Sequence, residues 1–364
     1  MKIWIIMKKR GRTRMDDLNK VVTIEDVARE AGVGKGTVDR VLHSRGRVAP
    51  ETREKVLQAI DKLNYKPNID ARMLAKKRSY RKAVCYHDKE KEFWDQVSAG
   101  IRRASEEYEQ MGVKVIPFVL PCIDVEMQLA VIRQVIDEHY DGLAIVPYLS
   151  QEITDALNEA VARGVEVVTF NSREAGVHAC YVGIDGIQSG RTAGRMMSMI
   201  APPGSRYMIV YSHSRLMMQI DERALGFQEV LRARRPDMQY INLDTAEEYT
   251  FEEDYDQVYE YVLRTLQKCP VDAIYATNEC VSAVGRAIDD LKPDHKVNVV
   301  GHDLTPSVMN YIRKGVIDAS IGQEPERQGF SSVDKICRKL LTGEEIRDEY
   351  TRISIVVSEN MDYL

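Results

Sequence analysis

The sequence lacks long apolar runs, and this absence argues against a membrane-spanning helix. No stretch approaches the ~20 consecutive apolar residues that a helix needs to cross a bilayer, so no membrane partner is expected. The apolar part of residues 2–7 is too short for the core of a signal peptide and is followed at once by Lys8, Lys9 and Arg10. We therefore expect a cytoplasmic protein.

Cysteine is also scarce, and the groups that enzymes and metal sites need do not cluster. The six cysteines are scattered, without a CxxC pair or a histidine at metal-ligand spacing, which is typical of reduced thiols. No Ser-His-Asp elbow and no pair of catalytic carboxylates stands out. The sequence therefore predicts no enzymatic activity, no metal site and no cofactor.

Length and charge indicate a globular chain with two unlike parts. A chain of 364 residues is too long for one ordinary core and favours two or three domains. Residues 1–82 contain 22 lysines and arginines against 10 acidic residues, whereas the remainder contains 29 against 46. A basic head on an acidic body favours a polyanionic partner for the head, although a solvated charged face would give the same composition.

Residues 22–66 carry the signals of three short helices. Thr23 can cap the first helix, Asp26 stands at the reciprocal capping position, and Gly32 permits a left-handed end. A tight turn leads into a second helix over residues 35–42, and Pro50 begins a third. In the third helix we expect four residues to be buried: Val56, Leu57, Ile60 and Leu63. This arrangement predicts an all-α helix-turn-helix headpiece.

The same residues resemble the headpiece of the lac repressor (LacI/GalR) family from end to end. The resemblance rests on four runs: VTIEDVAREAG at 22–32, TVDRVL at 37–42, TREKV at 52–56 and LNYKPN at 63–68. It implies that Lys35, Gly36 and Arg40 hold the positions that read base edges in the major groove. Phosphate contacts are implied for five further residues: Thr23, Thr37, His43, Arg47 and Thr52.

Residues 67–80 have few apolar groups and a basic end, which by themselves are typical of a flexible linker. The family resemblance implies that this segment folds into a hinge helix on operator DNA and that Ala71 and Leu74 contact the duplex. Leu74 matches a leucine that wedges into the minor groove, and such a wedge unstacks a base step and bends the DNA.

Residues 83–364 alternate β-rich runs with helical periods, which predicts an α/β domain with parallel sheets. The expected strands are 83–86, 113–120, 143–147, 165–170, 207–211, 273–277 and 297–300. The expected helices are 96–111, 127–139, 153–163, 187–200, 222–235 and 328–341. Ligands bind at the carboxyl ends of parallel strands, and polar residues such as Asn171, Asn278 and Asp303 follow predicted strands there.

This region resembles, more loosely than the head, the ribose-type sugar-binding proteins and the effector domains of the same repressor family. The resemblance rests on four runs: DERALGF at 221–227, YATNE at 275–279, VGHD at 300–303 and ASIGQ at 319–323. It implies a two-lobed, periplasmic-binding-protein-like domain. Hydrogen-bond partners of a sugar are implied at five positions: Asn171, Arg223, Asn278, Asp303 and Gln323. Phe93 and Trp94 are implied as stacking platforms.

The proposed sugar site departs from the family pattern at Asn171, which replaces an aspartate. This change disfavours an amino sugar, while an acidic sugar facing Arg173 and Arg223 stays open. Relative to the family pattern one residue is inserted after Asn171, so either Ser172 or Arg173 matches the family's arginine, and we include Arg173 among the candidate ligand residues.

Together these patterns predict a sequence-specific DNA-binding transcription regulator, of the repressor type, controlled by a small sugar-like effector. We expect a homodimer on a palindromic operator, because one three-helix head contacts too few base pairs for useful specificity. The alternative is a periplasmic-type sugar-binding protein, which would need a signal sequence and would have no use for the head. The sequence leaves open whether the effector releases or promotes DNA binding.

Overall fold

The computed structural model describes residues 22–42, 46, 48–63, 65, 79–88, 91–174, 176–211, 217–241, 255–278 and 280–363. The chain divides into two units, residues 1–77 and 78–364, which we call the headpiece and the body. Each is described by itself. Most of the predicted hinge segment at 67–80 lies outside the described residues.

The headpiece consists of three helices, α1 (Ile24–Ala31), α2 (Lys35–Leu42) and α3 (Pro50–Leu63), as predicted. The capping box at the start of α1 is present, because the Thr23 hydroxyl accepts from the Asp26 amide while the Asp26 carboxylate accepts from Thr23. Gly32 ends α1 with φ 66°, a left-handed conformation that glycine adopts without steric cost.

The headpiece core is small, and one predicted member is missing from it. Each helix contributes two buried residues: Val27 and Ala28, Val38 and Val41, Val56 and Ala59. The prediction that Leu57 is buried is wrong, because its side chain is 46% exposed. At about 100° per residue, position 57 lies off the face that positions 56, 59, 60 and 63 share, so Ala59 packs inward instead.

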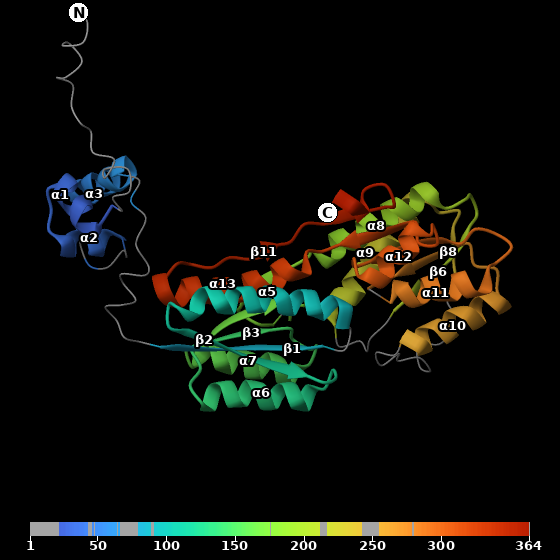
Figure 1. Cartoon of the computed structure of the whole chain (residues 1–364), viewed down its shortest axis with the longest axis horizontal. Coiled ribbons are helices and arrows are strands. Elements are labelled where there is room, and N and C mark those ends of the chain that lie inside the picture. Colours follow the sequence, from blue (N-terminus) through green and yellow to red (C-terminus); the bar gives the residue numbers. More distant parts are fainter. Residues whose placement is uncertain are drawn as a thin grey trace, which may run out of the picture. The chain divides into compact units, whose positions relative to one another are not determined.

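The body contains two sheets with the same strand order, each defining one lobe (Figure 1). Lobe 1 holds β11 (Glu349–Tyr350), β5 (Cys180–Gly183), β4 (Glu166–Phe170), β3 (Gly142–Ile145), β1 (Tyr80–His87) and β2 (Val113–Leu120), in that order across the sheet. Lobe 2 holds β12 (Ser354–Val356), β10 (Ala319–Gly322), β9 (Asn298–His302), β8 (Ala273–Ala276), β6 (Arg206–Val210) and β7 (Gln239–Tyr240). All described pairings are parallel except the one between β10 and β12.

Helices cover both faces of each sheet. In lobe 1, α5 (Lys91–Glu109) and α13 (Pro325–Thr342) lie on one face, and α6 (Val125–Asp137) and α7 (Gln151–Ala162) lie on the other (Figure 1). The helices of lobe 2 are α8 (Gly186–Ile200), α9 (Met218–Arg234), α10 (Tyr255–Lys268), α11 (Val281–Leu291) and α12 (Pro306–Arg313). A short 3-10 helix at Met361–Tyr363 ends the described chain. The predicted two-lobed α/β architecture with parallel sheets is thus confirmed.

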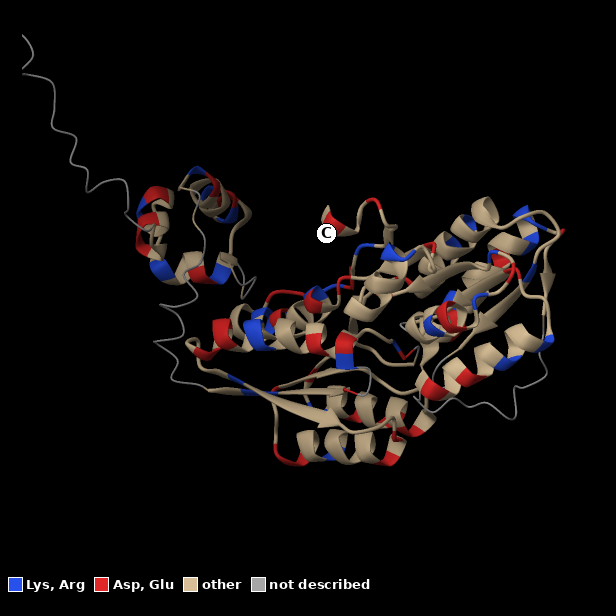
Figure 2. Cartoon of the chain, turned by 45° about the vertical axis from the view of Figure 1, so that its right-hand side comes forward, with Lys and Arg blue, Asp and Glu red and all other residues tan. Residues whose placement is uncertain are grey.

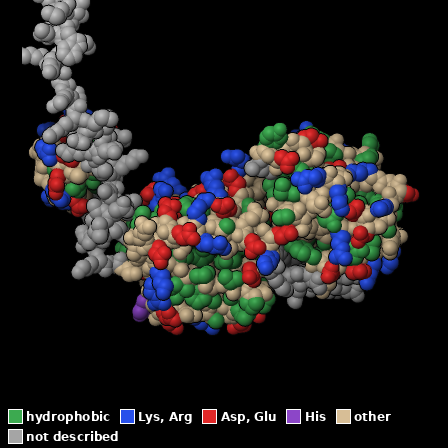
Figure 3. Space-filling model, in the orientation of Figure 1, with side chains coloured by type: hydrophobic (Ala, Val, Ile, Leu, Met, Phe, Trp, Pro, Cys, Tyr) green, Lys and Arg blue, Asp and Glu red, His purple; other side chains and the backbone are tan. Residues whose placement is uncertain are grey.

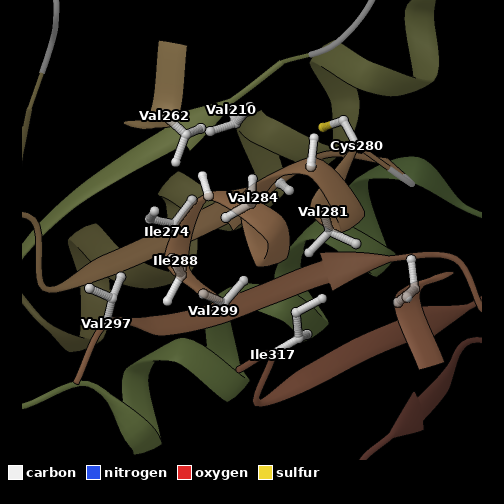
Figure 4. Packing of buried hydrophobic residues seen from close by; sticks show 14 of the residues in the cluster. Val210, Val262, Ile274, Cys280, Val281, Val284, Ile288, Val297, Val299 and Ile317 are labelled. Carbon is white, nitrogen blue, oxygen red and sulfur yellow. The ribbon is translucent and has the colours of Figure 1, made fainter. Parts of the chain in front are cut away.

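The period of two along the strands divides the core of lobe 2 into two layers. Met208 and Val210 of β6 pack with residues of α10, α11 and α12, whereas Tyr207 and Ile209 pack with α8 and α9. Figure 4 shows the first layer, in which Ile274 and Val299 of the sheet face Val284 and Ile288 of α11. Charged residues lie mainly on the helices and connecting segments. In Figure 2 the central strands are largely tan, the colour of residues without a charge of either sign.

Several elements of the body were not predicted. Among these are β5 and β10, which are four residues long and largely buried, so that no polar–apolar alternation marks them. The helices α10, α11 and α12 were not predicted either. A start signal for α12 was available, since Thr305 caps this helix and Pro306 occupies its first turn. No helix within the described ranges combines the length and apolar character needed to cross a bilayer.

The chain crosses between the lobes at three places: between β5 and α8, between β10 and α13, and between β11 and β12. A cleft lies between the two lobes. The carboxyl ends of β1 and β4 in lobe 1 and of β8, β9 and β10 in lobe 2 supply residues to this cleft.

Candidate functional site

The outward face of α2 carries the residues predicted to read DNA bases. Lys35, Gly36 and Arg40 are all exposed. The Lys35 ammonium lies 2.7 Å from a carboxylate oxygen of Glu25, and both side chains are more than half exposed. The Arg40 guanidinium bends back along its own helix, with its Nε 3.0 Å from the Gly36 carbonyl oxygen. Exposed contacts of this kind are weak, so both cations can reach a partner on DNA at small cost.

Gly36 is not required by the packing of the headpiece. A Cβ placed there would meet no atom within 4 Å, so the missing side chain leaves open surface beside Lys35 and Arg40. Of the other predicted DNA contacts, Thr23 caps α1, and Thr37 and Thr52 are half-buried on α2 and α3. Four lie outside the described residues: His43, Arg47, Ala71 and Leu74.

The body contains a buried cavity between the two lobes that gathers most of the predicted ligand residues. Seven of the predicted residues line it: Phe93, Trp94, Asn171, Arg223, Asn278, Asp303 and Gln323. Each is at most 6% exposed. Four lining residues were not predicted: His87, Met217, Gln219 and Ile220. Gln219 precedes Arg223 by four residues on α9, and this one-turn spacing was the available signal that both face the cleft.

Two of the cavity residues have an uncommon backbone conformation. Asn171 and Asp303 have φ angles of 61° and 73°, in the left-handed region that side chains other than glycine rarely adopt. Asparagine and aspartate tolerate this region better than other residues. Each directly follows a buried strand, so the left-handed turn sets the direction in which its side chain leaves the sheet.

Arg223 is positioned by the close contact of α8 and α9. A Cβ at Gly190 of α8 would collide with the Arg223 carbonyl, and one at Gly226 of α9 would collide with the Ile187 carbonyl. The two helix backbones therefore approach each other more closely than larger residues would allow. This contact places the first turn of α9, with Gln219 and Arg223, at the cleft.

A hydrogen-bonded group joins the charged side chains of lobe 2. Arg223 donates to the Thr277 carbonyl at 2.8 Å and to Oε1 of Gln323 at 3.0 Å. The Gln323 amide in turn donates to Oδ1 of Asp303 at 2.5 Å. Next to Asp303, burial and then Arg223 hold the pKa of His302 well below its usual value, so that ring stays neutral. Gln323 thus bridges a buried cation and a buried carboxylate.

Lobe 1 supplies the aromatic wall of the cavity. Trp94 is 2% exposed, with its ring centroid 4.7 Å from that of His87 and 5.1 Å from that of Phe93 in an edge-on arrangement. All three rings border the cavity. Aromatic faces of this kind can cover the C–H side of a sugar ring.

Several hydrogen bonds connect the lobes across the cleft. The Gln219 amide of lobe 2 donates to Oδ1 of Asn171 in lobe 1 at 2.7 Å. At the rim, the Glu92 carboxylate accepts from the Ser307 hydroxyl at 2.8 Å and from its backbone N–H at 3.1 Å, at the start of α12. Burial alone would raise the pKa of Glu92, but the hydrogen bonds from Ser307 and Thr305 outweigh it, so the pKa is lowered.

These contacts leave little free space inside. The cavity offers about 20 Å³ to a water molecule, which is room for roughly one water, whereas small-molecule sites usually measure ~300–1,000 Å³. A monosaccharide can therefore enter only if the lobes separate or the polar side chains rearrange.

Arg173 lies outside the lining of the cavity. Its guanidinium donates to the Tyr350 hydroxyl at 2.8 Å and lies over the Tyr181 ring at 4.3 Å from the centroid. The neighbouring Ser172 is 1% exposed, but it does not line the cavity either. The assignment of Arg173 as a ligand contact remains a prediction without support from its position.

A helix-turn-helix head on a two-lobed body defines the class of regulators that join a DNA-binding domain to a ligand-binding one. Residues 23–68 match the model of the lacI family of bacterial regulatory proteins, and residues 82–345 match that of the periplasmic binding protein domain. Over most of its length the chain therefore belongs to the periplasmic binding protein domain family, and its head matches the DNA-binding region of the lacI family. The family resemblance in the sequence is confirmed.

Known relatives agree with this assignment. The chain is 33% identical over 157 residues to catabolite control protein A of Staphylococcus xylosus, covering 43% of this chain and 46% of that protein. It is 32% identical over 173 residues to catabolite control protein A of Staphylococcus epidermidis, covering 47% and 50%. The chain thus spans about half the length of the curated relatives it matches.

Solved structures share the fold of the body. A solute binding protein from Burkholderia graminis in complex with D-arabinose superposes with a TM-score of 0.68, at 20% identity over 78% of this chain and 97% of that one. A putative LacI transcriptional regulator from Bacteroides fragilis gives a TM-score of 0.65, at 22% identity over 79% and 100%. At these identities the likeness concerns the fold alone.

Proposed function

We propose that this protein is a transcription regulator of the repressor type that binds operator DNA through α2 and a small sugar-like effector in the inter-lobe cleft. The observation that carries this proposal is the pairing of a helix-turn-helix exposing Lys35 and Arg40 with a buried cavity of sugar-binding composition. The chemistry is that of recognition, because the lining offers amides, one guanidinium, one carboxylate and aromatic rings. If the protein binds operator DNA, it acts in the cytoplasm.

The DNA-bound form is proposed to be a homodimer on a palindromic site. A single head of three helices buries only a small surface on DNA, and two heads related by two-fold symmetry roughly double the binding free energy. Leu74 of each subunit would then meet its counterpart at the operator centre. Light scattering combined with size exclusion should give the mass of a dimer, and a monomer at micromolar concentration would contradict this part.

Effector binding is proposed to act through lobe closure. A sugar that binds between the lobes favours one relative orientation of them and thereby changes the spacing of the two hinge segments. The effector can shift DNA affinity only by its own difference in affinity for the two states.

The DNA-binding proposal is tested by selecting duplexes from a random library with the full chain. We expect a two-fold symmetric motif to be enriched. Arg40→Ala should then weaken binding to the selected duplex by about 1–3 kcal/mol and relax the preference at one base position in each half-site. The matched control is Arg29→Ala, which removes an exposed arginine of α1 that pairs with Asp26. Equal losses on selected and scrambled duplexes would contradict base reading by Arg40.

A further inference from the structure

We propose that Gln219, which lines the cavity, restricts the effector to an uncharged polyhydroxy compound, and that Gln328 is a positioning residue that holds Asn171 and Gln323 behind it. This inference rests on the proposed effector site and narrows its ligand class. It depends on how the polar side chains of the cleft are bonded to one another.

The side chains form a closed ring of hydrogen bonds that spans both lobes. Arg223 donates to Oε1 of Gln219 at 3.4 Å, and the Gln219 amide donates to Oδ1 of Asn171 at 2.7 Å. The Asn171 amide donates to Oε1 of Gln328 at 3.2 Å, and the Gln328 amide donates to Oε1 of Gln323 at 3.2 Å. Arg223 also donates to Gln323, which closes the ring. All five side chains are buried.

The hydrogen bonds run in one direction, from a cation to an anion. Arg223 has only donors, each amide of the ring accepts on one side and donates on the other, and Gln323 finally donates to Asp303. Among the described residues that line the cavity, Arg223 is the only arginine and Asp303 is the only carboxylate. The buried polar group is therefore balanced in charge without a ligand.

A hydroxyl group can join this ring, whereas a charged group cannot. An O–H placed between an amide N–H and a carbonyl oxygen accepts from the first and donates to the second, so it keeps the direction of the ring. A carboxylate or phosphate only accepts, and an ammonium group only donates. Either would leave one amide of the ring without its partner in a buried site, and an unpaired buried polar group is unfavourable.

Charge balance leads to the same restriction. A ligand carboxylate would have to bind Arg223 and leave Asp303 as an uncompensated buried anion, and a ligand ammonium would do the reverse to Arg223. Arg173, the other cation that the sequence places near an acidic sugar, donates to the Tyr350 hydroxyl and does not line the cavity. Its charge is therefore not available to balance a ligand anion in the cleft.

Binding to matched sugars tests the proposal. The full chain is titrated by calorimetry with glucose, galactose and mannose, with the uronic acid, the 2-amino derivative and the 6-phosphate of each, and with pentoses and polyols. We expect binding only among the uncharged compounds, with at least tenfold weaker binding of every charged derivative. If a charged derivative binds and its uncharged parent does not, the inference is wrong while the effector function stands. If no compound binds, both the inference and the proposed effector function are wrong.

Variants of Gln219 test the role of the ring. Gln219→Glu turns a relay amide into an acceptor and adds a negative charge, so the best uncharged sugar should bind at least tenfold more weakly. In this variant, the affinity for the 2-amino derivative should rise at least tenfold relative to the affinity for the parent sugar. Gln219→Met keeps the volume without the amide and should weaken uncharged sugars without favouring amino sugars.

The matched control is Gln228→Glu, on the same helix but bonded only to the exposed Arg232, which should change affinity less than about twofold. Thermal unfolding verifies that each variant is folded. If Gln219→Glu does not fold, Gln219→Met provides the test of the ring. Unchanged sugar affinity in Gln219→Met would exclude a role for the ring.

Discussion

The two lobes of the body have the same strand order but contribute different chemistry to the cleft between them. Lobe 2 supplies the cation and the carboxylate, Arg223 and Asp303, with Gln323 between them. Lobe 1 supplies the rings of His87, Phe93 and Trp94 together with an amide. Because the backbone topology is shared, the division of roles must come from the side chains that each lobe places at the cleft, on α5 and α9 as well as at the strand ends. We infer that lobe 2 orients a ligand by directional bonds and that lobe 1 covers it.

If the lobes divide their roles in this way, the largest loss of sugar affinity should come from Arg223→Leu in lobe 2. The change leaves the Thr277 carbonyl without its Arg223 donor and removes one of the two donors to Oε1 of Gln323, and a buried group left unpaired costs about 1–3 kcal/mol. We expect sugar affinity to fall by about 100-fold or more and the free energy of unfolding to decrease. Calorimetry and denaturant unfolding measure both.

The matched control is Arg232→Leu, an exposed arginine on the same helix, which should change neither quantity by more than about 0.5 kcal/mol. Sugar affinity retained within threefold in Arg223→Leu would show that lobe 2 does not orient the ligand.

A smaller effect is expected from Trp94→Leu in lobe 1. A stacking ring contributes about 0.5–1.5 kcal/mol beyond the area it buries, so sugar affinity should fall by roughly three- to tenfold. Trp94→Phe keeps an aromatic face and should lose less. Calorimetry with the same sugar decides the point. A loss as large as that of Arg223→Leu would remove the proposed difference between the lobes.

The smallest expected effect concerns the contact between Glu92 and Ser307, which joins the lobes at the rim and should influence how far the cleft opens. The pKa of Glu92 is lowered by the bonds from Ser307 and Thr305, so the contact is fully present above the ordinary value of about 4.5. It is lost as the pH falls through the lowered pKa. We therefore expect the cleft to open as the pH falls through this range. In Glu92→Gln, the opening of the cleft should depend less on pH.

Trp94 can report this opening, since it is buried at the cleft and the chain has only one other tryptophan, Trp4. In a Trp4→Phe background, acrylamide quenching of Trp94 should rise below about pH 4.5 in the parent. Glu126→Gln, at the first turn of α6, should behave like the parent. The contact has no role in closure if Glu92→Gln and the parent quench alike as the pH is lowered from 7 through the lowered pKa of Glu92.

The described surface of the body is mixed in character. On the face shown in Figure 3, basic and acidic side chains are interspersed over the body with apolar groups between them. Large apolar residues that are exposed include Met199 at 55% and Leu225 at 57%, besides Val119, Met127 and Leu149 at about 40%. Scattered apolar residues of this kind are normal on protein surfaces.

The headpiece could be predicted almost completely from the sequence. Its helices are set by local signals, namely the Thr23 cap, the Gly32 end and the start at Pro50, which act within one turn of the chain. The one wrong prediction there, Leu57, concerned which side of a helix faces the core. In the body, long helices and strands such as β2 were predicted well, whereas the short buried strands β5 and β10 carry no periodicity to detect.

The sequence by itself determined the class of the protein, the alternation of strands and helices, and the polar residues at the strand ends. Only the tertiary structure decided that Asn171 meets Gln219 and Gln328, and that Arg173 turns away to Tyr350. These partners are far apart in the chain and on different elements, and their meeting depends on how the lobes close. Local propensity acts over a few residues, whereas the bonds of the cleft are fixed by sheet order and by the close contact of α8 with α9.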